Sequence, residues 1–276
     1  MRKEKIRETD YQQRERPKSR RAQFFDIAKH RFVEVLKLSL LQTVFNMPLI
    51  ASLVLFYQLV RNVTNLNSMM TVFIITAGCI FISMISSFTG LTGMFYCFKK
   101  MAYAEGEYAS SSYFVGLVAN WKKGIAIGII VGLSAALTIV GYFFFYYYLS
   151  SFNTAVAGFG IAIIVAQLLV VLIMGYYSIA QIVLYENSLR YILKNSFIFT
   201  LMRFHYNLPI FILHPSIIIA LVVIMEITMY VSLLFIIVFI AFGGLMWSLN
   251  CISAFDTFIN KDHYPDFYKK GLYKEA

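Results

Sequence analysis

Two side chains in this sequence are candidates for chemistry because they are ionisable and fall inside or beside long apolar runs. His214 lies within such a run, and Glu226 lies between two of them. An ionisable group at membrane depth is costly to desolvate, so its presence suggests a function. The alternatives are a hydrogen-bonded packing role for His214 and a solvated position in a turn for Glu226. We therefore treat both as candidate functional or packing residues.

The sequence lacks the common catalytic and metal-binding patterns. It contains no GxxxxGK[ST] loop that would cradle phosphates, no HExxH zinc motif and no GxSxG nucleophile motif. The three cysteines, Cys79, Cys97 and Cys251, have neither CxxC nor Cys/His spacing, which favours a packing role over a disulfide or a metal site. We therefore expect no catalytic, cofactor-binding or metal-binding residues, no cofactor and no enzymatic activity.

The composition indicates a membrane protein. Hydrophobic residues make up 59% of the 276 residues and charged residues only 14%, whereas about a quarter of an ordinary soluble domain is charged. In a soluble protein, the net charge of +10 would suggest nucleic acid as a partner. Membrane topology explains these basic residues better. We therefore expect the lipid bilayer as a partner and no nucleic acid.

Long apolar spans predict an all-α polytopic membrane helix bundle with six transmembrane helices. The spans cover about 35–60, 69–97, 124–149, 155–185, 208–225 and 229–254. Each is long enough to cross a bilayer as a helix. Only a few residues join the last two spans. If 208–254 formed one crossing, the count would be five and the C-terminus would lie outside.

The distribution of basic residues favours six spans with both termini in the cytoplasm. Twelve Lys or Arg lie from Arg2 to Lys37, before or at the start of the first span, four lie between the second and third, three between the fourth and fifth, and four follow the sixth. The opposite face receives only Arg61. Cytoplasmic flanks accumulate Lys and Arg, so we expect a multi-pass protein of the cell membrane. The predicted parts are a flexible basic cytosolic tail at 1–23, the membrane domain at 24–256 and a short cytosolic tail at 257–276.

Three amphipathic segments are predicted to lie in the cytoplasmic membrane interface as short helices. Each carries apolar residues at helical spacing on one face and charged residues on the other. The segments are 111–123, which contains Asn120 and Trp121, a stripe from Phe25 to Val35, and a stripe from Leu189 to Phe204. Together they would form a collar that either docks a soluble partner or only anchors the bundle.

Two groups of residues within the spans are expected to shape helix packing. Gly124, Gly128 and Gly132 recur every four residues and leave a flat face that another helix can approach closely. We expect that helix to belong to the same bundle, with a second subunit as the alternative. Asn46 and Pro48 should bend the first span. The bend would either line a substrate path or serve packing alone.

Several segments resemble the YesL-like family of bacterial membrane proteins, a family of unknown function. The resemblance is carried by VFNMPLI in the first span, TGLTGMFYCFKKMAYAEGEY from Thr89 to Tyr108, YFVGLVANWKKGIAIG from Tyr113 to Gly128, and LRYILKNSFIFTLMRFHYNLP from Leu189 to Pro209. It implies a companion of carbohydrate-uptake systems in Gram-positive bacteria. The long basic N-terminal segment departs from the family pattern, so the resemblance implies no role for residues 1–23.

These observations lead to two hypotheses about function. The first is a non-enzymatic accessory or regulatory component that acts on a cytosolic or membrane partner of a sugar-uptake system. The second is a transporter or permease subunit for a small solute such as a sugar, with a polar route near Asn46 and the Ser and Thr residues of the second span. A transporter should contain a continuous polar cavity, whereas a scaffold should be packed shut. The substrate and the oligomeric state stay open.

Overall fold

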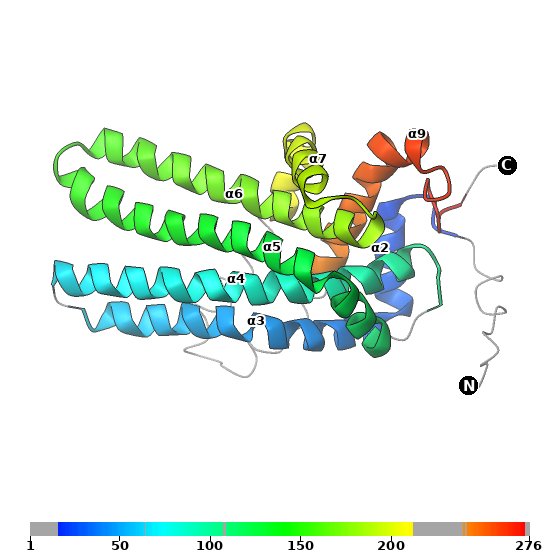
Figure 1. Cartoon of the computed structure of the whole chain (residues 1–276), viewed down its shortest axis with the longest axis horizontal. Coiled ribbons are helices and arrows are strands. Elements are labelled where there is room, and N and C mark those ends of the chain that lie inside the picture. Colours follow the sequence, from blue (N-terminus) through cyan, green and yellow to red (C-terminus); the bar gives the residue numbers. More distant parts are fainter. Residues whose placement is uncertain (1–15, 64, 107–108, 212–239, 241, 274–276) are drawn as a thin grey trace.

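The chain folds as a bundle of helices. The structure, a computed structural model, describes residues 16–63, 65–106, 109–211, 240 and 242–273. All regular secondary structure within these ranges is helical, as the sequence predicts. Figure 1 shows the long helices side by side along one axis, with shorter elements gathered at one end.

Four long helices form the body of the bundle. They are α3 (Phe32–Arg61), α4 (Leu66–Ala102), α5 (Ala109–Phe143) and α6 (Thr154–Leu184). The shortest of them has 30 residues and is therefore about 45 Å long, which exceeds the roughly 30 Å hydrocarbon core of a bilayer. All four belong to stretches long and apolar enough to cross a membrane. The fold thus indicates a membrane protein.

At one end of the bundle, asparagine side chains fix the starts of α4 and α6. Asn65 accepts a hydrogen bond from the backbone N–H of Ser68 at 2.8 Å, and Asn153 accepts one from Val156 at 3.1 Å. Each bond satisfies one of the amide groups that a helix leaves unpaired in its first turn. α5 reaches this end through a π-helical turn, η1 (Phe144–Tyr148), and a 3-10 turn, η2 (Leu149–Ser151).

The shorter elements lie at the opposite end. They are α2 (Arg20–His30), α7 (Leu189–Met202), η3 (Asp256–Asn260), α9 (Lys261–His263) and the helical stretches 204–211 and 242–255. α2 runs across the bundle axis there (Figure 1). The backbone N–H of Tyr273 donates to the carbonyl of Pro17 at 3.1 Å. The predicted C-terminal tail therefore packs against the N-terminal segment over its described part.

Four candidate crossings lie within the described residues, and they correspond to the first four predicted spans. The predicted spans at 208–225 and 229–254 fall partly outside the described residues, and their described parts, 208–211 and 242–254, are helical. The predicted count of six transmembrane helices therefore stays a prediction.

The predicted surface helix at 111–123 is wrong as a separate element. These residues form the first part of α5, which continues without a break to Phe143. Tyr113 is fully buried, and its carbonyl oxygen lies 2.7 Å from the position that a Cβ would take at Gly93 of α4. Val118 stays 70% exposed. The apolar stripe is therefore divided between a contact with α4 and the outer surface.

The segment around α2 also differs from the prediction. α2 begins at Arg20, inside the predicted flexible tail at 1–23. Its buried residues include Arg20 and Gln23, whereas Phe25 of the predicted apolar stripe is 70% exposed. The face of this helix that meets the protein therefore combines the polar residues Arg20 and Gln23 with Ile27, and Phe25 lies on the outer face.

Three glycines allow α5 to lie directly against α4. A Cβ at Gly128 would meet the Cα of Ile85 at 2.6 Å, and one at Gly132 would meet a backbone carbonyl oxygen of α4 at 2.7 Å. Gly124 continues this face toward the start of α5. Because helices in lipid associate through close packing and not through a hydrophobic drive, such contacts are a main source of stability. The glycine face thus meets a helix of the same chain.

Gly128→Ala should destabilise the protein by about 1–3 kcal/mol, the usual cost of overpacking, because the added Cβ would press on the α4 backbone. Thermal unfolding of the purified protein in detergent measures this effect. Gly78→Ala and Gly158→Ala are matched controls, since nothing lies within 4 Å of a Cβ at either position. They should leave stability unchanged or slightly raised. Equal losses in all three variants would contradict the proposed close contact.

Candidate functional site

A buried ion pair joins the two ends of the described chain. The Nη2 of Arg20 lies 2.8 Å from Oδ2 of Asp256, and the Nε of Arg20 donates to the same oxygen at 3.0 Å. The two side chains are only 6% and 9% exposed. Burying both charges is costly, and only good geometry and further hydrogen bonds offset that cost. The surroundings of the pair therefore matter.

Neighbouring polar groups complete the hydrogen bonds of this ion pair. Asn260 and the backbone N–H of Lys269 donate to Oδ1 of Asp256 at 2.9 and 3.2 Å. The Nη1 of Arg20 donates to Oε1 of Gln23 at 2.8 Å and to the carbonyl of Lys270 at 3.0 Å. We call this network of Arg20, Gln23, Asp256 and Asn260 the terminal clasp.

The terminal clasp is hydrogen-bonded to the end of α4 and to the end of α6. The side-chain amide of Gln23 donates to the carbonyl of Ala102 at 2.7 Å. The hydroxyl of Tyr185 donates to Oδ1 of Asn260 at 2.5 Å. Burial raises the pKa of Tyr185, so its hydroxyl stays protonated and able to donate. One polar network thus holds four separate segments of the chain together.

Aromatic and backbone contacts cover the terminal clasp. The ring of Tyr103 stacks on Phe267 with centroids 5.9 Å apart, and the guanidinium carbon of Arg20 lies 5.8 Å from the Tyr103 ring centre. Gly271 has a φ of +80°, and a Cβ there would fall 2.0 Å from the carbonyl oxygen of Ala102. Only glycine fits this position without a shift of the backbone. The C-terminal segment is therefore pressed directly against the end of α4.

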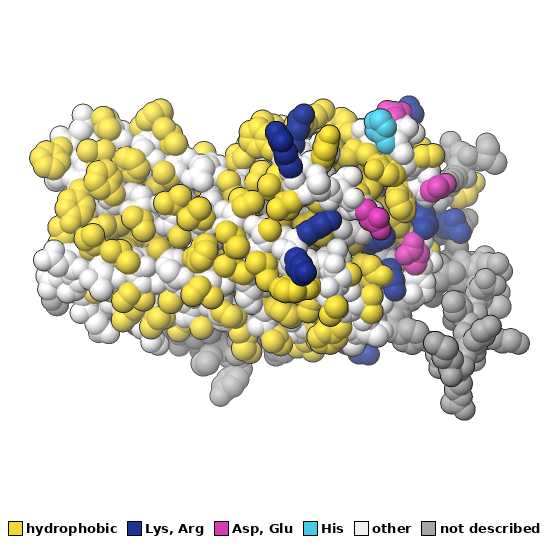
Figure 2. All heavy atoms as spheres, in the orientation of Figure 1, with side chains coloured by type: hydrophobic (Ala, Val, Ile, Leu, Met, Phe, Trp, Pro, Cys, Tyr) yellow, Lys and Arg dark blue, Asp and Glu magenta, His cyan; other side chains and the backbone are white. Residues whose placement is uncertain are grey.

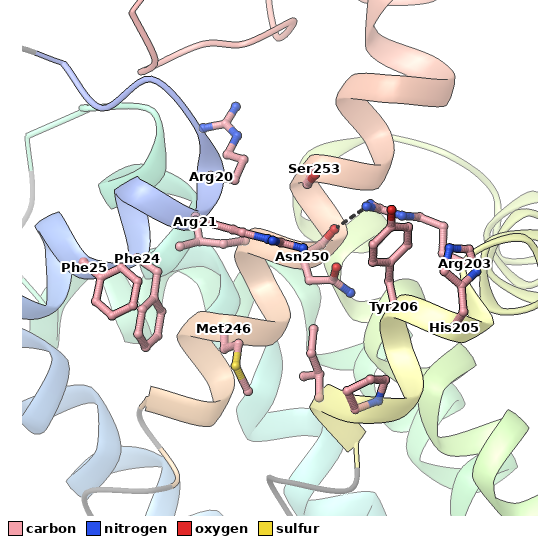
Figure 3. A pocket seen from close by; sticks show the side chains of 13 residues that line it. Arg20, Arg21, Phe24, Phe25, Arg203, His205, Tyr206, Met246, Asn250 and Ser253 are labelled. Carbon is pink, nitrogen blue, oxygen red and sulfur yellow. Dashed lines mark hydrogen bonds between the residues drawn. The ribbon is translucent and has the colours of Figure 1, made fainter.

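Beside the terminal clasp lies a cavity of about 410 Å³. It is bounded by α2 and by the helical stretches 204–211 and 242–255 (Figure 3). Its charged and aromatic lining consists of Arg20, Arg21, Arg203, His205, Phe24, Phe25 and Tyr206. The thirteen lining residues, all in the described part of the chain, include no Asp or Glu. The cavity therefore combines cations with apolar walls.

Comparison of the chain with protein-family models, with curated proteins and with solved structures finds no match. The site has to be understood from its own geometry.

An amide and phenol cluster supports one side of the cavity. The hydroxyl of Tyr177 and the side-chain amide of Asn250 both donate to Oδ1 of Asn207, each at 2.9 Å. Arg203 donates to the carbonyl of Asn250 at 3.4 Å and lies 5.1 Å from the ring centre of Tyr206. These contacts connect α6 with 204–211 and 242–255, and they fix Arg203 at the cavity.

The predicted polar residues of the first span form an interface with α4. Asn46 accepts hydrogen bonds from Gln42 at 3.2 Å and from the hydroxyl of Ser87 at 2.6 Å. Gln42 also donates to the carbonyl of Ser87 at 3.1 Å and accepts from Tyr113 at 3.3 Å. Pro48 lies inside α3 and is exposed. Asn46 is therefore engaged in helix packing.

The other predicted residues are spread over the bundle. Asn120 donates to the carbonyl of Gly116 within α5 at 3.0 Å, and Trp121 is 45% exposed. His214 and Glu226 lie outside the described residues. None of the predicted candidates within the described residues lines the cavity beside the terminal clasp.

The sequence reasoning missed Arg20 and Asp256 as a pair. Arg20 was one of nine basic residues in an apparently unfolded segment. Asp256 stands directly after an apolar run, and an acid in that position needs a partner. That rule was a usable signal, but nothing in the sequence indicated which cation would meet it. Among the described residues, no group of three or more His, Cys, Asp or Glu is placed to hold a metal ion.

Asp256→Asn should destabilise the protein by about 3–5 kcal/mol, because the charge of Arg20 would stay buried without a counter-charge. The double variant Arg20→Gln/Asp256→Asn should lose less than the sum of the two single variants. Thermal unfolding in detergent provides both values.

Glu105→Gln is the control for removing an acid at this end of the bundle. Glu105 pairs with Lys270 at 2.7 Å, but both side chains are more than one third exposed. A loss of only about 0–1 kcal/mol is expected for such a pair. If Asp256→Asn cost no more than Glu105→Gln, the terminal clasp would not be a determinant of stability.

Proposed function

We propose that the protein is a non-enzymatic accessory or regulatory component of the cell membrane, with the terminal-clasp end facing the cytoplasm. In this proposal the chain crosses the membrane six times. Its partner is a cytosolic or membrane component of a carbohydrate-uptake system. The observation that carries the proposal is the gathering of basic residues at one end of an apolar bundle.

The basic side chains and the terminal clasp share one end of the protein. In Figure 2, Lys and Arg gather over the half of the molecule where α2, α7 and α9 lie, together with Asp, Glu and His, whereas the other half shows hydrophobic and uncharged groups. Among the described basic residues, Arg61 at the end of α3 lies at the opposite end. Cytoplasmic flanks of membrane proteins are enriched in Lys and Arg. This asymmetry supports the proposed orientation.

The interface between α3 and α4 favours a scaffold over a transporter subunit. Ser86 donates to the carbonyl of Phe45 at 2.9 Å, and the hydroxyls of Ser52 and Ser83 lie 3.0 Å apart. Thr89 donates to the carbonyl of Ile85 in its own helix at 2.7 Å. The hydroxyls that a polar route would need are therefore used in packing. These contacts support the scaffold over a polar route near Asn46.

The carbohydrate-uptake part of the proposal rests on the resemblance of several segments to the YesL-like family. The end that such a partner would meet carries exposed apolar residues on α7. Tyr191 is 65% exposed, Leu201 is 51% exposed and Phe197 is 48% exposed. Exposed aromatic residues next to cations are typical of protein interfaces. α7 is therefore the proposed docking element.

Orientation can be tested with single cysteines in a Cys79→Ser background, since the other two cysteines are buried. In intact cells, Phe152→Cys should react with a membrane-impermeant maleimide, because Phe152 is 87% exposed and lies at the end opposite the terminal clasp. Glu186→Cys, at an exposed position near α7, should react only after permeabilisation. The reverse labelling pattern would overturn the proposed orientation.

Docking can be tested by affinity purification of the full chain from native membranes. We expect subunits of a carbohydrate-uptake system to be retained, and Tyr191→Ala to lower their recovery about fivefold, as for an aromatic interface residue worth about 1 kcal/mol. Phe159→Ala is the matched control, because Phe159 is 70% exposed on α6 within an apolar crossing. Sugar flux through the purified chain alone in proteoliposomes would favour the transporter instead.

A further inference from the structure

The cavity beside the terminal clasp carries positive charge that its own walls do not neutralise. Arg20 is paired with Asp256, whereas the side chain of Arg203 donates to the carbonyl of Asn250 and lies beside the ring of Tyr206, neither of which carries a negative charge. Arg21 is exposed, and Figure 3 shows its side chain extending toward Asn250 across the cavity. Since the described residues that line the cavity include no acid, its chemistry suits an anion.

The apolar part of the cavity continues into the surface of the first crossing. Phe24 lines the cavity and packs on Phe242 with ring centroids 6.3 Å apart, and Phe242 packs on Phe32 at 5.8 Å. Phe32 begins α3 and is 46% exposed, and Val33 beside it is 62% exposed. An apolar path therefore leads from the arginines to the part of the bundle that crosses the membrane. A free inorganic anion would leave this path unused.

The arginines of the cavity and its apolar path together fit a ligand with an anionic headgroup and an apolar tail. Guanidinium groups match phosphate oxygens through paired N–H donors. The volume of about 410 Å³ falls in the range of small-molecule sites, and it accommodates a headgroup with the first part of an acyl chain. The membrane itself supplies such molecules at high local concentration, and basic residues near its surface attract them.

We propose that this cavity binds one anionic phospholipid. Arg21 and Arg203 hold the phosphate, and the acyl chains follow Phe24 and Phe25 toward the start of α3. Phe25 is 70% exposed, as expected for an aromatic ring that meets the interface of a bilayer. The proposal needs neither the cytoplasmic orientation nor the uptake partner.

The test uses the purified full chain in nanodiscs of phosphatidylcholine with increasing fractions of phosphatidylglycerol. Native mass spectrometry of the released protein counts the bound lipids. Phosphatidylglycerol should be retained over phosphatidylcholine. Arg21→Gln should weaken that preference about fivefold, which corresponds to about 1 kcal/mol for one basic residue at the membrane surface. Because Arg21 is exposed, this variant should keep the fold, and its unfolding temperature checks that point.

Lys29→Gln is the matched control, because it removes one exposed charge from the same helix outside the cavity. It should leave the preference unchanged. Equal weakening by both variants would mean a diffuse basic surface and would overturn the site. The proposal would also fail if the wild-type chain showed no preference for phosphatidylglycerol. The last measurement adds inorganic phosphate to discs of pure phosphatidylcholine. If phosphate raised the unfolding temperature as much as phosphatidylglycerol does, the cavity would be assigned to a free anion.

Discussion

The arrangement of this end of the protein depends on one buried ion pair. Arg20 and Asp256 are 236 positions apart in the sequence, and their side chains meet at 2.8 Å with almost no exposure. A pair taken out of water is stable only when its remaining donors and acceptors are also satisfied. Gln23, Asn260 and backbone groups of the α4 end and the C-terminal segment supply these bonds. The ion pair and the hydrogen bonds around it therefore hold α2 in its position.

The rest of the bundle is held by a different kind of contact. Between helices in lipid there is no hydrophobic drive, so close backbone approach and interhelical hydrogen bonds take its place. Gly128 lets α5 reach the backbone of α4, and Asn46 with Gln42 and Ser87 joins α3 to α4. These three polar residues of α3 and α4 are thus engaged in helix packing. The cavity lined by arginines lies instead at the basic end.

The sequence was sufficient to predict the long apolar helices of the described chain but not the structure at their ends. Long apolar runs locate α3, α4 and α6 to within a few residues, because burial in hydrocarbon requires an unbroken helix. The sequence predicts a break in the helix before Gly124, but α5 is continuous there. The two lysines extend from its surface, and Lys123 donates to the carbonyl of Asn187 at 3.0 Å. A cation is therefore compatible with the middle of a long helix when it can reach a neighbouring carbonyl.

The candidate site was harder to predict because its residues are distant in sequence and ordinary in type. A count of positive charges treats Arg20 and Arg21 alike. In the structure Arg20 is buried in the terminal clasp, whereas Arg21 extends toward Asn250 across the cavity. No local pattern separates the two roles, since the distinction depends on where Asp256 lies after folding.

The terminal clasp and the cavity are linked through consecutive residues of α2. Successive side chains on a helix point about 100° apart, so a helix that turns Arg20 toward Asp256 must direct Arg21 to a neighbouring surface. That surface is the cavity, where Arg203 approaches from the other side (Figure 3). Arg20 itself lines the cavity while its guanidinium stays bound to Asp256. The buried pair thus fixes the rotation of α2, and through that rotation it places the Arg21 cation beside the exposed aromatic residues of α2 and α3.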